Sequence, residues 1–334
     1  MEFIGRILHQ TIVDASPILL CVLGGLWAYK ANVLNVALEG MMLAGAFTSV
    51  LLLHFGMGFV PAYLIAILVS LLLGLIFSAL GITKKGNVIV IGLAINMLVP
   101  AVADFVLKKM NSANIQIPGF NTADMKINIP LIEDIPILGS LLSGHTLFTY
   151  VSFLLIIVMS ILMYRTKFGI YVRVVGENED SAKSLGLRTD LYKYIAIAIG
   201  AVCCALAGVN LSVEGLGLFT NNMTAGRGFI AIAAIYCGGG SPAQSAIYAL
   251  LFGLARSLAI NLQVYAGPAA TLFDVIPYVI MTVVLAVVSL IKYKNRKERS
   301  FREGGMPSES NRIDRCRYGE GFYRPRRACE LSAE

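Results

Sequence analysis

Apolar runs of about 20 residues recur along most of the chain, and they constrain its fold more than any other feature. A bilayer core about 30 Å thick is crossed by a helix of about 20 apolar residues, which satisfies its backbone groups internally. Only 14% of the residues are charged. The sequence therefore predicts an all-α polytopic membrane protein with about nine transmembrane helices in one bundle. The expected spans are 12–29, 34–54, 59–81, 87–107, 146–164, 191–213, 224–240, 243–262 and 272–291.

Positive charges are concentrated between or after these spans, at 84–85, 165–193 and 292–299. Because Lys and Arg are enriched in cytoplasmic loops, we expect these three segments on the cytoplasmic side. The number of spans then makes 108–145 an external loop and puts the N-terminus outside, although a broken helix near residue 33 would reverse that end. Residues 1–291 form the predicted transmembrane domain, and 292–334 a basic, disordered cytoplasmic tail.

The residue inventory argues against catalysis within this chain. The three histidines are scattered, and no carboxylate pair or His/Cys cluster has ligand spacing. No G-x-x-x-x-G-K-[ST] loop occurs, so ATP is not bound by that route. We predict no catalytic residue, metal site or cofactor in this chain. If the chain takes part in ATP-driven transport, another subunit must bind the nucleotide. The net charge of +7 is explained by cytoplasmic loops, so no nucleic-acid partner is expected.

Polar residues inside the apolar runs are candidates for a transport pathway, because burying them against lipid is costly. Asn35 and Glu39 lie four residues apart, on one face if this stretch is helical. Gly92 and Asn96 repeat that spacing in a later span. The alternative is a helix–helix contact built from small and polar residues. For Glu39 and Asn96 both interpretations stay open.

Other residues in or beside the spans have simpler expectations. Asp14 is expected near a membrane surface, in contact with solvent. Glu214 and Arg227 flank a short external loop and can pair there. The stretch CGGGSP at 237–242 is expected to form a tight inner turn, because glycine permits positive φ and Ser-Pro starts the next helix.

The stretch 173–188, RVVGENEDSAKSLGLR, is a polar segment between two apolar runs. The run from Glu177 to Leu185 can form a short helix, with Gly176 and Gly186 suited to its ends. A helix lying on the membrane surface can transmit a rigid-body movement from a partner. The alternative is a solvated loop with no partner.

Five motifs occur in order: NVALEGMMLAGAF (35–47), GLAINML (92–98), TKFGIYVRVVGENEDSAKSLGL (166–187), AGRGFIAIAA (225–234) and IPYVIMTVVLA (276–286). On these motifs, residues 12–291 resemble the permease subunits of bacterial ABC importers of the ribose/branched-chain amino acid permease superfamily. The likeness is greatest to the nucleoside and simple-sugar branch that works with basic-membrane-protein-type binding lipoproteins.

The resemblance implies a multi-pass subunit in the bacterial cell membrane, in contact with membrane lipid. Its implied partners are an ABC ATPase, a second permease that completes a heterodimer, and an extracytoplasmic substrate-binding lipoprotein. It also implies that the polar loop docks on the ATPase, since 180–186 matches a looser form of the E-A-A-x-x-x-G coupling motif. The expected ATPase-coupling residues are Gly176, Glu177, Asn178, Asp180, Ala182 and Gly186.

The favoured function is thus ATP-driven import of a nucleoside or simple sugar by alternating access. The alternative is a gradient-driven secondary transporter or channel for a small polar solute. Ion coupling needs ionisable pathway residues, and only Glu39 is a fair candidate among the spans. A membrane-embedded enzyme lacks a nucleophile–base pair.

Overall fold

The computed structural model describes residues 2–127, 143–263, 273 and 275–302. The chain divides into two compact units, 1–285 and 286–334, and each is considered by itself. Of the predicted tail at 292–334, residues 303–334 lie outside the described part of the chain.

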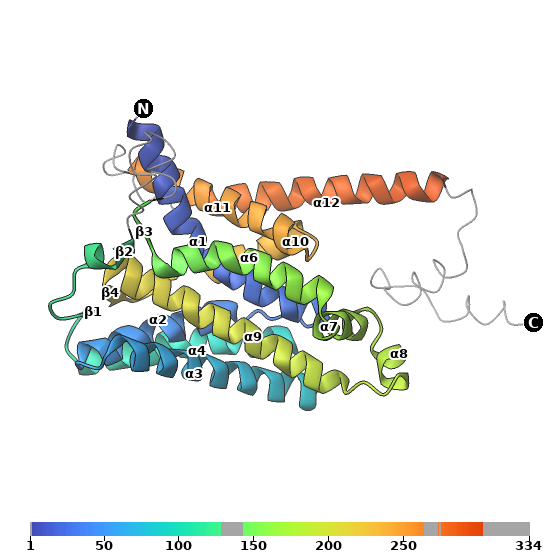
Figure 1. The fold of residues 1–334 in the computed structure, drawn as a ribbon, viewed down its shortest axis with the longest axis horizontal. Helices are drawn as coiled ribbons and strands as arrows, with labels where there is room; N and C mark the ends of the chain where they lie inside the picture. Colours follow the sequence, from blue (N-terminus) through green and yellow to red (C-terminus); the bar gives the residue numbers. More distant parts are fainter. Residues whose placement is uncertain (1, 128–142, 264–272, 274, 303–334) are drawn as a thin grey trace, which may run out of the picture. The chain divides into compact units, whose positions relative to one another are not determined.

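Helices make up most of the described chain (Figure 1). Their bounds are α1 Glu2–Lys30, α2 Leu38–His54, α3 Phe59–Ser78, α4 Val88–Lys109, α6 Leu147–Arg165, α7 Lys167–Glu177, α8 Glu179–Ser184, α9 Thr189–Val209, α10 Arg227–Cys237, α11 Pro242–Gln263 and α12 Ile276–Arg302. Short π-helical turns extend α3 and α9, and a 3-10 turn lies at Thr122–Met125.

Seven helical segments of the described chain are long and apolar enough to cross a membrane, which confirms the polytopic all-α class. Two expected spans, 34–54 and 224–240, correspond instead to shorter apolar helices, α2 with 17 residues and α10 with 11. At 1.5 Å per residue, α10 is only about 16 Å long, roughly half the thickness of a bilayer core.

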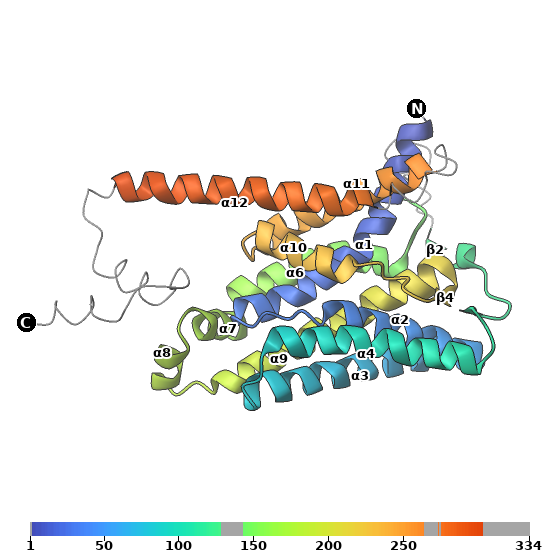
Figure 2. The same cartoon turned by 180° about the vertical axis from the view of Figure 1, so that it is seen from behind.

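Two small sheets lie at the end of the bundle opposite to α7 and α8, as the two views show (Figures 1 and 2). β1 (Asn114–Gln116) pairs antiparallel with β4 (Leu218–Thr220). β2 (Lys126–Ile127) pairs antiparallel with β3 (His145–Thr146). The start of α1 reaches the same end, because the His9 ring stacks on His145 with 4.4 Å between centroids. The predicted loop at 108–145 therefore carries strands in its described part.

The centre of the larger unit is formed by α1, α2 and α9, which approach closely through small residues. A Cβ on Gly24 of α1 would lie 2.6 Å from the Cβ atom of Cys203 in α9. A Cβ on Gly45 of α2 would lie 2.8 Å from the Cα atom of Ala205. Small residues at such crossings let helix backbones pack tightly, which is the main attraction between helices in lipid.

We predict that Gly45→Val destabilises the protein, because added methyl groups would push α2 away from α9. Overpacking of this kind costs about 1–3 kcal/mol. Melting temperature in detergent and abundance in the membrane should both fall. The matched control is Gly58→Val, since a Cβ on Gly58 would have its nearest neighbours, two Pro61 ring atoms, at 3.7 Å. Equal behaviour of the two variants would contradict the tight crossing.

Candidate functional site

The start of α10 lies inside the helical bundle rather than at its end. Its first residue, Arg227, lies beside Asp14, which is close to the middle of α1. Glu39, in the first turn of α2, also contacts the start of α10. Its carboxylate accepts hydrogen bonds from the N–H groups of Gly226, at 2.9 Å, and Gly228, at 2.5 Å. Glu39 is only 9% exposed, so two helix starts share one buried carboxylate.

Two properties of α-helices explain this arrangement. The first N–H groups of a helix have no intrahelical acceptor, and the N-terminal end carries partial positive charge. Glu39 supplies both an acceptor and a negative charge. The flanking glycines allow the contact: Gly226 has a left-handed φ of 71°, and a Cβ on Gly228 would lie 2.6 Å from the Glu39 nitrogen. The AGRG stretch of the fourth motif is therefore a helix start fitted around a carboxylate.

Asn35 does not share a helix face with Glu39, so that expectation is wrong. α2 begins at Leu38, and Asn35 lies before it. The Asn35 Oδ1 atom accepts a hydrogen bond from the Ala37 N–H at 3.1 Å, which closes a turn ahead of the helix. Its Nδ2 atom is buried and has no hydrogen-bond partner among the described residues.

Gly92 and Asn96 join α4 to the start of α2. Asn96 Oδ1 accepts a hydrogen bond from the Gly40 N–H at 2.8 Å, and Asn96 Nδ2 donates to the Val36 carbonyl at 2.9 Å. A Cβ on Gly92 would lie 2.9 Å from the Cβ atom of Val36. These contacts favour the helix–helix interpretation over a pathway for both residues.

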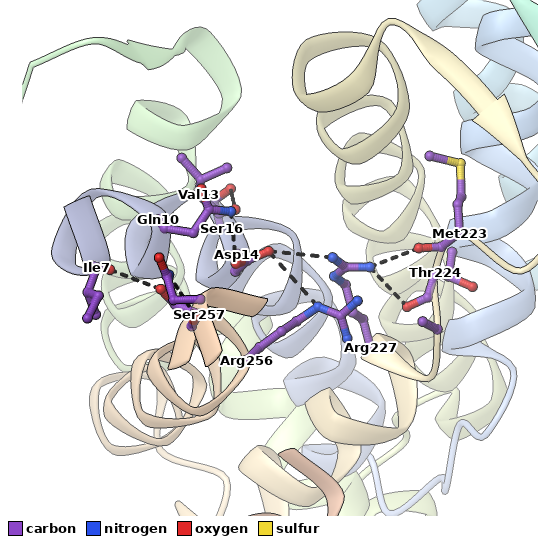
Figure 3. Close-up of polar contacts among 12 residues, drawn as sticks. Ile7, Gln10, Val13, Asp14, Ser16, Met223, Thr224, Arg227, Arg256 and Ser257 are labelled. Atoms are coloured by element: carbon purple, nitrogen blue, oxygen red, sulfur yellow. Dashed lines mark hydrogen bonds and ion pairs between the residues drawn. The ribbon is translucent and has the colours of Figure 1, made fainter. Parts of the chain in front are cut away.

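Asp14 holds the centre of a buried cluster of charged side chains (Figure 3). Its Oδ1 atom lies 3.6 Å from Arg227 Nη2 and 4.0 Å from Arg256 Nε, on α11. Gln10 donates to the other carboxylate oxygen at 3.0 Å. The side chains of Asp14 and Arg227 are each 6% exposed. The expectation of a solvated Asp14 is wrong, because burial against two guanidinium groups replaces its contact with water.

The expected pairing of Glu214 with Arg227 is also wrong. Glu214 lies in the π-helical turn after α9, where it accepts hydrogen bonds from Asn210 Nδ2 at 3.0 Å and the Phe148 N–H at 3.2 Å. Arg227 turns to Asp14 on α1 instead. The sequence places the two residues close along the chain, but the strand β4 and the inward start of α10 separate them.

The expected glycine turn at 237–242 is present. Gly239 and Gly240 have φ values of 61° and 72°, and Pro242 is the first residue of α11. Within the described part of the chain, no group of three or more His, Cys, Asp or Glu residues is placed to hold a metal ion.

The polar stretch at 173–188 folds into the end of α7 and the short helix α8 (Glu179–Ser184), which begins two residues later than expected. Asn178 caps α8, since its Oδ1 atom accepts a hydrogen bond from the Ser181 N–H at 3.0 Å. At the other end, the N–H groups of Gly186 and Leu187 donate to carbonyls of the helix, and Gly186 has a φ of 78°. This is a glycine-terminated helix end.

The other expected coupling residues lie in different environments. Ala182 is fully buried, whereas Glu177 and Asp180 are exposed. Gly176 does not end α8, contrary to expectation, because it lies within α7. A Cβ at Gly176 would overlap the carbonyl of Lys30, so α7 crosses the end of α1 at backbone contact.

Glu179 links α8 to α9, and sequence reasoning missed it. Its carboxylate accepts hydrogen bonds from Lys183 Nζ at 2.7 Å within α8, and from Lys193 Nζ at 2.5 Å on α9. Thr189 Oγ1 donates to it at 3.4 Å. The hydrogen bonds from Lys183 and Lys193 lower the pKa of Glu179 to about 2, so the carboxylate stays ionised near neutral pH. The i,i+4 spacing of Glu179 and Lys183 was the available signal.

The chain is similar to known permeases along nearly its whole length. It is 32% identical to the guanosine ABC transporter permease protein NupQ of Bacillus subtilis, over 92% of this chain and 97% of NupQ. It is 29% identical to the nucleoside ABC transporter permease protein NupC of Lactococcus lactis, over 84% and 91%. It is 28% identical to TsgC13 of Haloferax volcanii, provisionally named a glucose ABC transporter permease, over 79% of each chain.

A family profile gives the same result. The profile described as branched-chain amino acid transport system / permease component matches residues 7–285. This range includes the starts of α2 and α10, the helices α7 and α8, and Glu179, which links α8 to α9. The chain therefore belongs to this permease family, as its motifs predicted, and it is a multi-pass transport component of an ABC transporter rather than an enzyme.

Proposed function

We propose that this chain is the transmembrane subunit of an ATP-driven importer for nucleosides in the bacterial cell membrane. The observation that carries the proposal is the 32% identity with a guanosine permease over nearly all of both chains. The likeness to a nucleoside permease supports the same substrate class. A simple sugar is the second candidate, favoured by the likeness to a provisionally named glucose permease.

We propose nine membrane segments, seven continuous spans and the two short helices α2 and α10. Each short helix continues a segment that enters the bundle without helical structure, at 31–37 and 221–226. In transporters, irregular backbone at membrane depth is tolerated where it is enclosed by protein. Residues 165–193 then lie in the cytoplasm, 108–145 outside, and 292–334 form a cytoplasmic tail separate from the domain at 1–291.

ATP and Mg are bound in this proposal by a partner ATPase, which receives the polar segment formed by α7 and α8. The residues facing that partner or shaping the segment are Gly176, Glu177, Asn178, Asp180, Ala182 and Gly186. Movement of α8 reaches α9 through Glu179 and Lys193, and movement of α7 reaches α1 through the close contact at Gly176. A second permease, as a heterodimer, and an external substrate-binding lipoprotein complete the assembly in membrane lipid.

A gradient-driven transporter fits the contacts of Glu39 poorly. An ion-coupling carboxylate must exchange its partner during transport, whereas both oxygens of Glu39 accept backbone N–H groups of the α10 start. Removing that carboxylate would leave these N–H groups buried without acceptors, at a cost of about 1–3 kcal/mol each. Glu39 is better explained as an anchor than as an ion site.

We expect uptake by the complete importer to need ATP hydrolysis by the partner, because α7 and α8 can only pass on a movement made elsewhere. Uptake of labelled guanosine should stop when the partner's ATP site is inactivated. Unlabelled guanosine or uridine should compete, and ribose or galactose should not. Uptake that survives inactivation and follows a proton or sodium gradient would refute ATP-driven import, whereas competition by ribose alone would refute only the nucleoside assignment.

We expect Glu179→Gln to weaken coupling more than Lys183→Gln. The first change removes the charge that joins α8 to α9, while the second removes only an exposed pair within α8. Loss of about 1 kcal/mol corresponds to roughly a fivefold change, so uptake per ATP hydrolysed should fall by about that factor. Both variants should reach the membrane at normal levels. Equal coupling ratios in the two variants would rule out Glu179 as the link.

A further inference from the structure

The end of the bundle that carries α7 holds a cavity of 840 Å³. Two of its lining residues, Gly176 and Glu177, belong to the proposed ATPase-coupling segment, but no role above assigns the cavity a small-molecule ligand. Its walls come from the end of α1, residues 32–34, the start of α4, the end of α6, α7 and the end of α10. We call it the α7 cavity. Small-molecule sites measure roughly 300–1,000 Å³, so a metabolite or a lipid headgroup fits.

Three features make the α7 cavity favourable for an anion. Lys30 and Arg173 both line it, against a single lining carboxylate, that of Glu177. The Arg173 Nε atom is buried and has no hydrogen-bond partner among the described residues. Because the Nε atom is shielded from the cavity, a ligand there meets the terminal nitrogens of the guanidinium group.

The start of α4 is the third feature. Residues 86–89 form part of the wall, so the N-terminal end of a 22-residue helix borders the cavity. Asn87 Oδ1 accepts hydrogen bonds from the N–H groups of Ile89, at 3.0 Å, and Val90, at 3.4 Å. Because Asn87 already accepts from these two N–H groups, the helix end contributes partial positive charge, rather than free donors, beside the two cationic side chains.

Aromatic rings complete the lining. Tyr29 and Tyr236 pack edge to face with 5.1 Å between ring centroids, and both line the cavity. The Tyr164 ring lies 5.1 Å from the Arg173 guanidinium carbon. Tyrosines at the ends of spans also favour the polar surface of a bilayer. The lining therefore combines sites for a phosphate with apolar surface for the group that carries it.

We propose that the α7 cavity binds a phosphate-bearing ligand, held by Lys30, Arg173 and the start of α4. Such a ligand bridges α1, α4 and α7 at the point where Gly176 lies against the Lys30 carbonyl. Its occupancy restrains α7 relative to α1 and so regulates transport, a consequence that rests on the proposed function. Two sources share this chemistry: the headgroup of an anionic lipid, and the nucleoside monophosphate made when an imported nucleoside is phosphorylated.

Binding is tested on the complete importer without transport. One arm measures retention of phosphatidylglycerol by native mass spectrometry, and the other measures binding of labelled guanosine monophosphate by equilibrium dialysis. The variants are Arg173→Gln and Lys30→Gln, with Arg173→Lys to restore the charge. The matched control is Lys167→Gln, which makes the same charge change at an exposed position of α7 outside the cavity.

We expect Arg173→Gln and Lys30→Gln each to weaken the binding of one probe about tenfold, because each loses a charge-assisted hydrogen bond. Arg173→Lys should restore part of that binding. The probe that responds identifies the source. Binding of both probes that is the same in Arg173→Gln, Lys167→Gln and wild type would overturn the proposal. The ATPase contributes equally to all variants, so its own nucleotide sites do not affect the comparison. Failure of guanosine uptake would refute the nucleoside assignment of the proposed function and leave this binding result intact.

Discussion

The Glu39 carboxylate lies at the starts of two helices, and the interior of the bundle depends on that contact. α2 begins one residue before Glu39, and α10 begins between the two glycines whose N–H groups Glu39 binds. Leu38, Gly40, Arg227 and Gly228 are buried, so an acceptor for the N–H groups at these helix starts must come largely from the protein. Two further contacts lie at the same junction. Asp14 of α1 pairs with Arg227 of α10, and the Tyr278 hydroxyl donates to the Ala225 carbonyl at 2.6 Å.

Around this polar junction, α1 and α9 provide continuous, tightly packed helices. Gly24 and Gly200 bring them together, while Gly45 fits α2 against α9. Dense packing of this kind transmits displacement because little free volume is available to absorb it. α9 also joins the two ends of the bundle. It meets Glu179 at Lys193, and the turn that follows it leads into β4, which pairs with β1. A displacement of α8 therefore acts on α9, which contacts most of the central helices.

The class of fold could be predicted from the sequence because long apolar runs have few alternatives to membrane helices. Motif order gave the family, and the spacing of Gly186 after a short polar run predicted a glycine-terminated helix. Hydropathy cannot detect a helix that starts inside the bundle, so α2 and α10 were expected as full spans. For the same reason, Asn35 was placed on a helix that begins after it.

Contacts between side chains far apart in the sequence were the other feature that the sequence could not predict. Asp14 and Arg227 are far apart in the chain, and no local pattern joins them. Glu214 seemed the natural partner of Arg227 because it is close in sequence, yet it bonds to Asn210 and the Phe148 N–H. Asn96 and Gly92 were correctly placed together on one helix, but their contact with the start of α2 depends on tertiary structure.

Hydrogen–deuterium exchange over residues 221–230, compared between wild type and Glu39→Gln, tests the central claim most directly. The substitution keeps the size of the side chain and removes the negative charge of the carboxylate, whose two oxygens accept hydrogen bonds from the Gly226 and Gly228 N–H groups. A hydrogen bond to a charged group contributes about 1.5–3 kcal/mol, so exchange at Gly226 and Gly228 should quicken by roughly tenfold or more. Exchange on the central part of α9 should change little. If residues 221–230 exchange at the same rate in both proteins, Glu39 does not hold the start of α10 in place.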